Sequence, residues 1–407
     1  MRCGLLGRQL GHSYSPQIHA HLGDYSYTLF EREPEQIEDF LKHDGFTAIN
    51  VTVPYKKEVI PFLDSLTSRA EKMGAVNTVV RKNGKLIGHN TDFYGFHCML
   101  KESGLAVRDK KVLVLGSGGA SNTVVQVLQA QGAQTVVISR SGENHYNNLH
   151  LHADASVIVN TTPVGMYPNP GTSALSLDLF PALEGVLDLI YNPSRTKLLQ
   201  DAENRGLIAR NGLFMLVAQA KEAAEWFLDR AISDDVIPRI HRHLAAQTEN
   251  IILIGMPGCG KTTIGKLLAE KLNKPFLDAD MELMRMAGRS IPEIFAQDGE
   301  STFRQLETET LAALGMRSGT VIATGGGCVT RRENYPLLHQ NGTIVWLNRD
   351  ISKLPTEGRP LSQTNRLSDM WQTRQPLYKE FADIRIDNNT SAGQTVAAIV
   401  NQLGRSL

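Results

Sequence analysis

Residues 251–263 read IILIGMPGCGKTT, an apolar run followed by a glycine-rich turn and a helical pattern. Residues 255–262 (GMPGCGKT) fit GxxxxGK followed by Ser or Thr, and the flanking strand and helix are the setting in which this pattern binds phosphate. Backbone N–H groups of the turn and the Lys261 ammonium suit phosphate oxygens, and the Thr262 hydroxyl suits Mg²⁺. We therefore predict a nucleoside triphosphate site, with ATP contacts at Gly258, Gly260, Lys261, Thr262 and Thr263.

Short β-branched runs alternate with helical patterns along most of the chain. Such alternation predicts an α/β fold with parallel sheets. The runs are 47–53 (TAINVTV), 111–116 (KVLVLG), 135–140 (TVVISR), 156–162 (SVIVNTT), 185–191 (GVLDLIY), 251–255 (IILIG), 320–327 (TVIATGGG) and 343–348 (TIVWLN). An amphipathic helix is expected over 214–230, and the polar segment AAQTEN indicates a domain boundary near 245–250.

The composition limits the classes of partner. The chain has 407 residues, with 42 Lys and Arg against 42 Asp and Glu, and this length favours about two or three domains. Zero net charge provides no overall positive field for nucleic acid or an anionic membrane. No apolar run approaches the roughly 20 residues of a membrane-spanning helix, and MRCGLLGRQL lacks the apolar stretch of a signal peptide. We expect a cytoplasmic protein without nucleic-acid or membrane partners, and the sequence does not indicate its oligomeric state.

The cysteines are Cys3, Cys98, Cys259 and Cys328, and none is spaced as CxxC. This spacing argues against both a zinc site and a disulfide framework. We expect them to be small buried apolar residues.

A second glycine-rich turn lies in KVLVLGSGGAS, residues 111–121. It matches only GxGG, because Ser121 stands where the dinucleotide-binding pattern has its third glycine. A strand precedes it, a helix follows, and the next strand ends about 20 residues later, as in a βαβ unit. That strand ends in Ser139 and Arg140 rather than an acidic residue, which suits the 2′-phosphate of NADP(H). The predicted contacts are Gly116, Gly118, Gly119, Ala120, Ser139 and Arg140.

Polar loops upstream of residue 93 follow the ends of predicted strands: GHSYSP, NVTVPYK, GAVNT and GHNTD. Loops of this kind carry chemistry more often than packing. Lys56 and Asp92 offer a proton donor and an anion to hold it, as the reduction of a ketone requires. Taken singly, Lys56 is more often a solvated cation and Asp92 more often a helix N-cap.

Polar residues also follow the phosphate-binding turn. PFLDAD places Asp278 and Asp280 at the end of a short strand, where alternate residues point to opposite faces. One carboxylate can help to hold Mg²⁺ while the other faces the acceptor. Further on lie GESTFRQLE with Arg304 and Glu307, TGGG at 324–327, and TRQPLY with Arg374. Taken singly, each of these features is more often a solvated helix face or a turn.

In this order and spacing, the motifs of residues 250–407 resemble shikimate kinase. The resemblance implies a P-loop domain with a parallel sheet like that of nucleoside monophosphate kinases, and a catalytic role for Asp280, which orients the attacking hydroxyl. It implies that Arg359, in GRPL at 358–361, reaches over the transferring phosphoryl group, and that Thr262 and Asp278 are the magnesium ligands. The shikimate contacts it implies are Asp280, Arg304, Gly326, Gly327 and Arg374. The segment before Arg359 is shorter than usual and lacks the arginine that commonly faces the adenine.

Residues 1 to about 243 resemble shikimate dehydrogenase. The motifs that carry this resemblance are GHSYSP, NVTVPYK, GAVNT, GHNTD, LGSGGAS, NTTPVGM, DLIYNPSRTKLL and GLFMLVAQA. The resemblance implies a substrate lobe of residues 1–92 plus 210–245 and a Rossmann NADP lobe of 93–209, ahead of the kinase domain at 250–407.

The same resemblance implies residue roles. Lys56 and Asp92 are the catalytic pair, and Ser13 and Ser15 bind the substrate carboxylate. Thr52, Asn77, Asp92 and Gln219 contact ring hydroxyls. Tyr191 lines the cleft, and residues 162–166 with Gly212 border the nicotinamide.

Together the two resemblances imply a bifunctional enzyme of the shikimate pathway. One half reduces 3-dehydroshikimate to shikimate with NADPH, and the other phosphorylates shikimate to shikimate 3-phosphate with MgATP. Three alternatives stay open: a dehydrogenase that prefers quinate, a nucleotide-sensing P-loop domain without catalysis, and a scaffold that is not an enzyme.

Overall fold

The computed structural model describes residues 1–11, 13–354 and 367–404. The chain divides into two compact units, the first made of Met1–Tyr191 and Leu198–His243, the second of Asn192–Lys197 and Leu244–Leu407. In the part of the chain that the structure describes, no helix combines the length and apolar character needed to cross a bilayer. The predicted lid residue Arg359 lies outside the described residues.

The first unit begins with a six-stranded sheet of order β2-β1-β3-β5-β6-β4. Its strands are β1 (Arg2–Gly7), β2 (Ser26–Glu31), β3 (Ala48–Val51), β4 (Ser65–Leu66), β5 (Thr78–Lys82) and β6 (Lys85–His89). The accompanying helices are α1 (Ser15–His19), α2 (Ile37–His43), α3 (Ser68–Met73) and α4 (Asp92–Ser103).

The predicted α/β architecture is confirmed, but this sheet is mixed rather than parallel throughout, because β5 pairs antiparallel with both β3 and β6. Asn83 and Gly84 connect β5 to β6, and both have positive φ angles, 52° and 77°. Two-residue turns with positive φ at both positions join antiparallel strands, and Asn-Gly is the preferred pair. The Asn-Gly turn thus reverses the chain and makes the sheet mixed.

The second sheet of this unit is parallel throughout, in the order β11-β10-β9-β7-β8. Its strands are β7 (Lys111–Leu115), β8 (Gln134–Ile138), β9 (Val157–Asn160), β10 (Gly185–Asp188) and β11 (Ile208–Arg210). The helices that follow are α5 (Gly119–Ala130), α6 (Lys197–Asn204), α7 (Leu213–Leu228) and α8 (Val236–Thr248). The predicted helix over 214–230 corresponds to α7.

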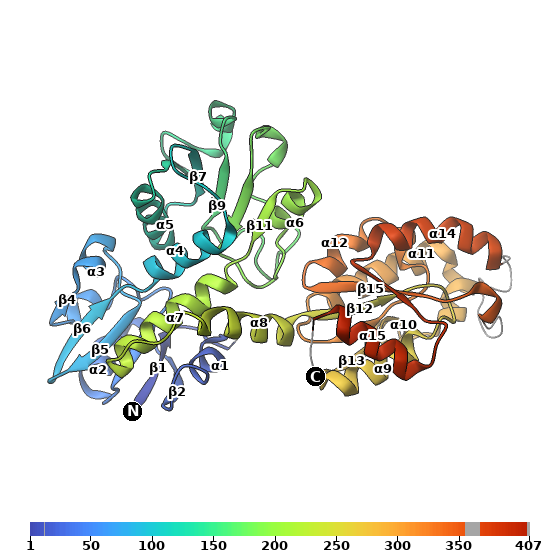
Figure 1. Ribbon diagram of the computed structural model, residues 1–407, viewed down its shortest axis with the longest axis horizontal. Coiled ribbons are helices and arrows are strands. Elements are labelled where there is room, and N and C mark those ends of the chain that lie inside the picture. Colours follow the sequence, from blue (N-terminus) through green and yellow to red (C-terminus); the bar gives the residue numbers. More distant parts are fainter. Residues whose placement is uncertain (12, 355–366, 405–407) are drawn as a thin grey trace. The chain divides into compact units, whose positions relative to one another are not determined.

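Helices α4 and α7 pack against each other between the two sheets of the first unit (Figure 1). On α4, Phe96 and Met99 join the core of the second sheet, whereas Ala223 and Phe227 on α7 pack against the first sheet. A Cβ atom at Gly95 of α4 would lie 2.8 Å from the backbone oxygen of Met215 on α7. Glycine therefore permits this close approach of the helices, which brings the polar end of α4 next to the side of α7.

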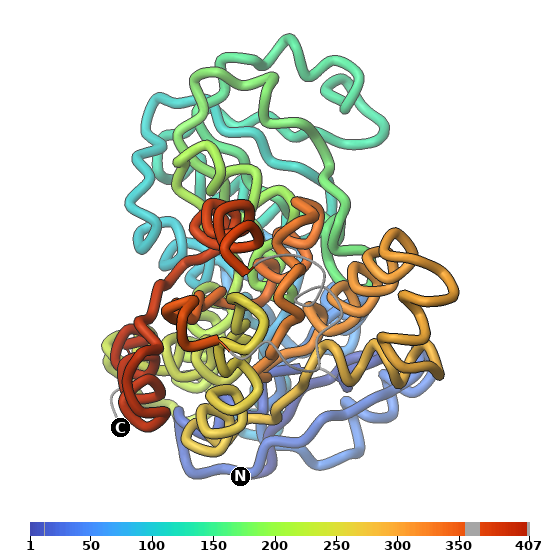
Figure 2. The backbone as a smooth tube through the Cα atoms, turned by 90° about the vertical axis from the view of Figure 1, so that its right-hand side faces the viewer, coloured from blue at the N-terminus to red at the C-terminus, as the bar shows by residue number. Residues whose placement is uncertain are grey.

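The second unit contains a parallel sheet of order β13-β14-β12-β15-β16, coloured from yellow to red in Figures 1 and 2. Its strands are β12 (Asn250–Ile254), β13 (Phe276–Asp278), β14 (Val321–Ala323), β15 (Gly342–Asn348) and β16 (Ile384–Asp387). Its helices are α9 (Lys261–Leu272), α10 (Ala279–Ala287), α11 (Ile291–Gly315), α12 (Asn334–His339), α14 (Leu367–Phe381) and α15 (Ala392–Gln402). Strand β12 is buried along its whole length, as expected for a parallel sheet covered on both faces.

All eight β-branched runs form strands, so this part of the sequence prediction is confirmed. The four cysteines are free, as expected. Three of them are buried, but Cys98 is partly exposed.

Candidate active sites

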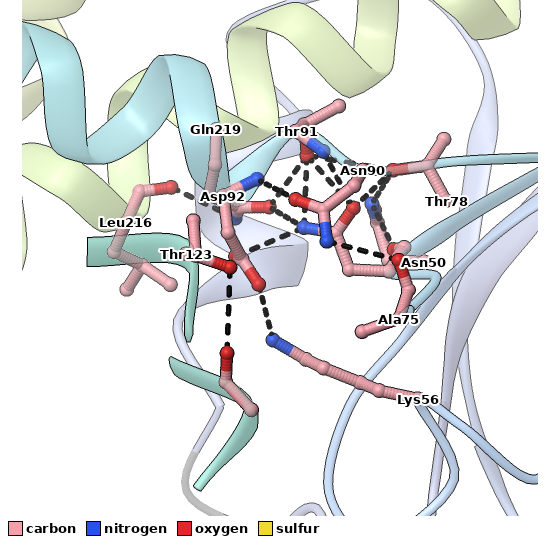
Figure 3. A network of polar contacts seen from close by, with 12 residues as sticks. Asn50, Lys56, Ala75, Thr78, Asn90, Thr91, Asp92, Thr123, Leu216 and Gln219 are labelled. Carbon is pink, nitrogen blue, oxygen red and sulfur yellow. Dashed lines mark hydrogen bonds and ion pairs between the residues drawn. The ribbon is translucent and has the colours of Figure 1, made fainter. Parts of the chain in front are cut away.

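The first candidate site centres on a close ion pair. The Nζ atom of Lys56 lies 2.6 Å from Oδ2 of Asp92 (Figure 3). Asp92 is the first residue of α4, where the positive end of the helix dipole favours a carboxylate. Side-chain exposure is 27% for Lys56 and 12% for Asp92, so the pair is sheltered while the ammonium stays within reach of a ligand.

Asn77 connects the loops around this pair. Its Nδ2 atom donates to Oδ1 of Asp92 at 2.9 Å and to Oγ1 of Thr91 at 2.9 Å. Its Oδ1 atom accepts from the Thr91 backbone N–H at 2.7 Å. Gln219 on α7 also takes part, because its Oε1 atom lies 3.5 Å from Asn77 Nδ2. Four predicted residues, Lys56, Asn77, Asp92 and Gln219, therefore form one network.

Two further polar side chains, Asn50 and Tyr27, support Asn77. The Nδ2 atom of Asn50 donates to the backbone oxygen of Asn77, and the Tyr27 hydroxyl donates to Oδ1 of Asn50 at 2.8 Å. Tyr27 was not predicted, because a tyrosine on a strand gives no signal of its hydroxyl partner. Asn50 was noted only as part of a polar loop.

The remaining predicted substrate contacts lie on neighbouring segments and do not bond to the ion pair. Ser13 Oγ accepts from the Ser15 backbone N–H at 3.2 Å, and the Thr52 backbone N–H donates to the oxygen of Leu6 at the end of β1. The Tyr191 ring lies 5.5 Å from that of Tyr14 between centroids. Burial raises the pKa of Tyr191 above its ordinary value, so its hydroxyl remains a donor.

The predicted dinucleotide contacts lie in the glycine turn after β7. Gly116 has a φ of 103°, and a Cβ there would lie 2.9 Å from Oγ1 of Thr161. A Cβ at Gly118 or at Gly119 would meet no heavy atom within 4 Å, and Gly119 begins α5, whose first backbone N–H groups have no partner inside the helix. Such a turn at a helix N-terminus suits a pyrophosphate.

The predicted 2′-phosphate contacts follow β8. Arg140 is exposed, and its charge lowers the pKa of the nearby Tyr146, which burial raises more strongly. Ser139 bonds through its backbone N–H to the oxygen of Asn144. Gly212 lies elsewhere, just before α7, and a Cβ there would approach the Leu189 backbone oxygen to 2.0 Å. Its glycine is therefore explained by packing against the chain that follows β10.

The second candidate site is built on the turn after β12. Lys261 is 8% exposed, and its Nζ donates to the backbone oxygens of Gly255 at 2.9 Å and Met256 at 3.1 Å. The Thr262 hydroxyl donates to Oδ2 of Asp278 at 2.8 Å. A hydroxyl beside a carboxylate is the type of donor set that holds Mg²⁺ together with phosphate oxygens. The chemistry of Thr262 and Asp278 thus fits a magnesium ion.

A buried ion pair lies on α11 beside this turn. Arg304 donates from Nη1 to Oε2 of Glu307 at 2.7 Å, and the two side chains are 9% and 3% exposed. Burial raises the pKa of Glu307 against the opposing effect of Arg304. A Cβ at Gly327 would lie 2.2 Å from Arg304 Nη1, so TGGG needs a glycine where the guanidinium passes.

Arg374 on α14 reaches the same loop, and its Nη1 donates to the backbone oxygen of Gly326 at 3.1 Å. The Tyr378 hydroxyl donates to the same oxygen at 2.5 Å. Tyr378 was not predicted, although it lies four residues after Arg374 and hence on the same helix face.

These elements of the second unit line an open cavity of about 710 Å³. Every predicted kinase-site residue that the structure describes lines it: Gly258, Gly260, Lys261, Thr262, Thr263, Asp278, Asp280, Arg304, Gly326, Gly327 and Arg374. Arg349 also lines the cavity and was not predicted. Its position directly after the strand TIVWLN was the signal available, because ligands of open α/β sheets bind beyond the carboxyl ends of strands.

Comparison with known proteins identifies the first unit. A shikimate dehydrogenase (NADP(+)) of Clostridium perfringens (strain SM101 / Type A) is 37% identical over 244 residues, which cover 54% of this chain and 90% of that protein. The chain belongs to the shikimate dehydrogenase family. The family model for the shikimate dehydrogenase substrate binding domain matches residues 5–79.

Solved structures agree with this assignment. Shikimate dehydrogenase 1 from Peptoclostridium difficile has a TM-score of 0.57 and 34% identity, over 60% of this chain and 98% of that chain. The shikimate 5-dehydrogenase from Thermus thermophilus, in complex with NADP(H) and shikimate, has a TM-score of 0.54 and 30% identity, over 60% and 99% of the chains.

The second unit carries a different domain. The shikimate kinase family model matches residues 257–404. The polypeptide therefore joins a shikimate dehydrogenase to a shikimate kinase domain, and it is a bifunctional enzyme of the shikimate pathway. The two families imply NADP for the dehydrogenase unit and ATP for the kinase domain.

Proposed function

We propose that the dehydrogenase unit reduces 3-dehydroshikimate to shikimate and that Lys56 donates the proton. NADPH supplies the hydride when bound. As hydride reaches the carbonyl carbon, the oxygen becomes basic and takes a proton from the Lys56 ammonium, which leaves a neutral amine. The observation that carries this proposal is the contact of 2.6 Å between Lys56 and Asp92, which keeps the ammonium oriented before transfer.

The substrate would lie against the network around Asp92. Asn77 and Gln219 present amide groups there, and Asp92 Oδ1 is held by Asn77, so the carboxylate has little freedom to rotate. Such groups suit ring hydroxyls, which both donate and accept. Ser13 and Ser15 would bind the carboxylate of the substrate.

Arg140 would select NADP(H) over NAD(H). A guanidinium beside the strand end can bind the two negative charges of a 2′-phosphate, whereas a ribose hydroxyl gives it no anionic partner. The exposed position of Arg140 after β8 supports this role.

We propose that the kinase domain transfers the terminal phosphoryl group of ATP to shikimate. Asp280 would accept the hydroxyl proton as the oxygen attacks phosphorus, and the bond to the ADP oxygen breaks. Arg304 and Arg374 would bind the shikimate carboxylate by paired hydrogen bonds. Thr262 and Asp278 would hold Mg²⁺, which neutralises phosphate charge in reactions of this class.

The two reactions would be consecutive, because the first product is the second acceptor. By the family resemblance, the hydroxyl that reduction creates is the one that the kinase phosphorylates. The fusion of the two units thus combines two consecutive reactions of one pathway in a single polypeptide.

Separate assays of the two halves test the proposal. We expect NADP⁺ reduction with shikimate to exceed that with quinate, and ADP release to depend on added shikimate. A preference for quinate would replace the first substrate. ADP release that ignores shikimate would favour a nucleotide-sensing domain over a kinase.

A further inference from the structure

Arg349 occupies the ligand-binding edge of the kinase sheet. Strand β15 pairs directly with β12, in the register Ile254 with Trp346. Arg349 follows the last residue of β15, and the phosphate-binding turn follows the last residue of β12, so both leave the parallel sheet at its carboxyl edge. Arg349 and the phosphate-binding turn therefore start from neighbouring strands of the sheet.

The Arg349 guanidinium lies beside the turn itself. Its Nη1 atom is 3.8 Å from the position that a Cβ would occupy on Gly260. The same position lies 3.3 Å from Nδ2 of Asn388, which in turn donates to the backbone oxygen of Cys259. Asn388 therefore fixes the turn, and Arg349 adds a positive charge next to it.

The other cations of the cavity have protein partners. Arg304 pairs with Glu307, Arg374 donates to Gly326, and Lys261 donates to two backbone oxygens of the turn. Among the residues that the structure describes, Arg349 has neither an ion pair nor a side-chain hydrogen bond, and its Nε is a buried donor without an acceptor. A buried donor left unpaired costs free energy, so an anion that accepted a hydrogen bond from Arg349 would remove that cost.

We propose that Arg349 binds the phosphates of the nucleotide, alongside the backbone of the turn. This inference rests on the proposed function of the domain as an ATP-dependent kinase, and it adds a residue to that site. In the proposed function, Lys261 and the magnesium donors Thr262 and Asp278 stabilise the phosphoryl group that is transferred. Arg349 stands on the β15 side of Gly260, and its fork of donors matches phosphate oxygens. It therefore holds the part of the nucleotide that stays on the enzyme as ADP.

Binding of ADP to the full-length protein, measured by calorimetry without shikimate, tests this role. We expect Arg349→Ala to raise the Kd for ADP at least about tenfold, as loss of a charge-assisted hydrogen bond does. Arg349→Lys keeps the charge but loses the forked set of donors. Its Kd for ADP should therefore lie between that of the parent protein and that of Arg349→Ala. Arg332→Ala is the matched control, because Arg332 is 79% exposed and is not among the cavity-lining residues.

Inorganic tripolyphosphate separates phosphate contact from stacking on the base. We expect Arg349→Ala to weaken tripolyphosphate as well as ADP. An ADP Kd within about twofold of the Arg332→Ala value would overturn the proposal, and so would weakened ADP with unchanged tripolyphosphate, which would place Arg349 on the adenine.

These outcomes are distinct from a failure of the proposed reaction. If ADP release were independent of shikimate, the kinase assignment would be lost while the binding comparison still reported on Arg349. If the thermal unfolding profile of Arg349→Lys is unchanged, its weaker binding of ADP does not result from misfolding.

Discussion

Lys56 and Asp92 are 36 positions apart in the sequence and meet at 2.6 Å between Nζ and Oδ2. Replacing Lys56 by alanine removes the proposed proton donor, and the loss of a general acid reduces turnover by at least about 100-fold. We expect Lys56→Ala to cause such a loss in the reduction of 3-dehydroshikimate, followed by NADPH absorbance.

The neighbouring Lys57 is exposed and supplies the control for this experiment. Lys57→Ala should retain nearly full dehydrogenase activity, and both variants should retain shikimate-dependent ADP release. Undiminished reduction by Lys56→Ala would mean that another group donates the proton, or that this half is not an enzyme.

Arg140 should decide the choice of cofactor. We expect Arg140→Ala to raise the KM for NADPH by about 10- to 100-fold, the range that hydrogen bonds to charged groups represent, and to leave the weak use of NADH unchanged. Initial rates at varied cofactor concentrations measure both values. Arg108→Ala, which removes another exposed arginine of the same unit, should change neither KM. Equal effects on NADPH and NADH would contradict a 2′-phosphate contact.

The buried pair on α11 should control acceptor binding in the kinase domain. In Glu307→Gln the Arg304 charge loses its buried partner, and removal of one member of such a pair is strongly unfavourable. We expect the KM for shikimate in the ADP-release assay to rise at least about tenfold, while the affinity for ADP stays near that of the parent protein.

Glu309 lies on the exposed face of the same helix, so Glu309→Gln is the matched control and should behave as the parent. If Glu307→Gln left the KM for shikimate unchanged, the pair would have a structural role without an influence on the acceptor.

His19 should make the dehydrogenase unit sensitive to acid. Its ring stacks on Tyr27 with centroids 4.1 Å apart, and burial lowers the His19 pKa to about 3. The unfolded chain binds a proton near pH 6.5, so the folded form loses relative stability as pH falls from about 6.5 towards 3. Between about pH 7 and about pH 5 we expect a loss of about 2 kcal/mol from this residue.

Urea unfolding of the parent protein and of His19→Gln at these two pH values measures that loss. The variant keeps a hydrogen-bonding group near Tyr25, whose hydroxyl lies 2.7 Å from His19 Nδ1. Its stability should depend less on pH than that of the parent. An identical pH dependence in both proteins would assign the acid sensitivity to other groups.

The kinase site was largely predictable because its signals are local. The backbone of the turn over residues 255–262 itself provides the phosphate-binding groups. Asp278, the partner of the Thr262 hydroxyl, lies at the end of the next strand in the sequence. The partnership of Arg304 with Glu307 also follows from i,i+3 spacing on a helix. The spacing does not reveal that both side chains are buried. Because they are buried, breaking the pair costs more free energy than it would on a solvated helix face.

The dehydrogenase site was less predictable because its contacts join distant segments. Asn77 bonds to Thr91 and Asp92 only because β5 and β6 form an antiparallel hairpin. Recognising the Asn-Gly turn at residues 83–84 would have predicted that hairpin, whereas the runs considered in the sequence favoured parallel strands. Tyr27 and Asn50 support the network through tertiary contacts that no local pattern encodes.

We propose that one polypeptide performs both steps in succession. A single progress curve, with 3-dehydroshikimate, NADPH and MgATP present from the start, follows NADPH loss and ADP gain together. We predict that NADPH falls first, that ADP appears after a lag as shikimate accumulates, and that Lys56→Ala suppresses both signals while Lys261→Ala suppresses only ADP. ADP formation without prior NADPH loss, or either signal remaining flat in the parent protein, would contradict this proposal.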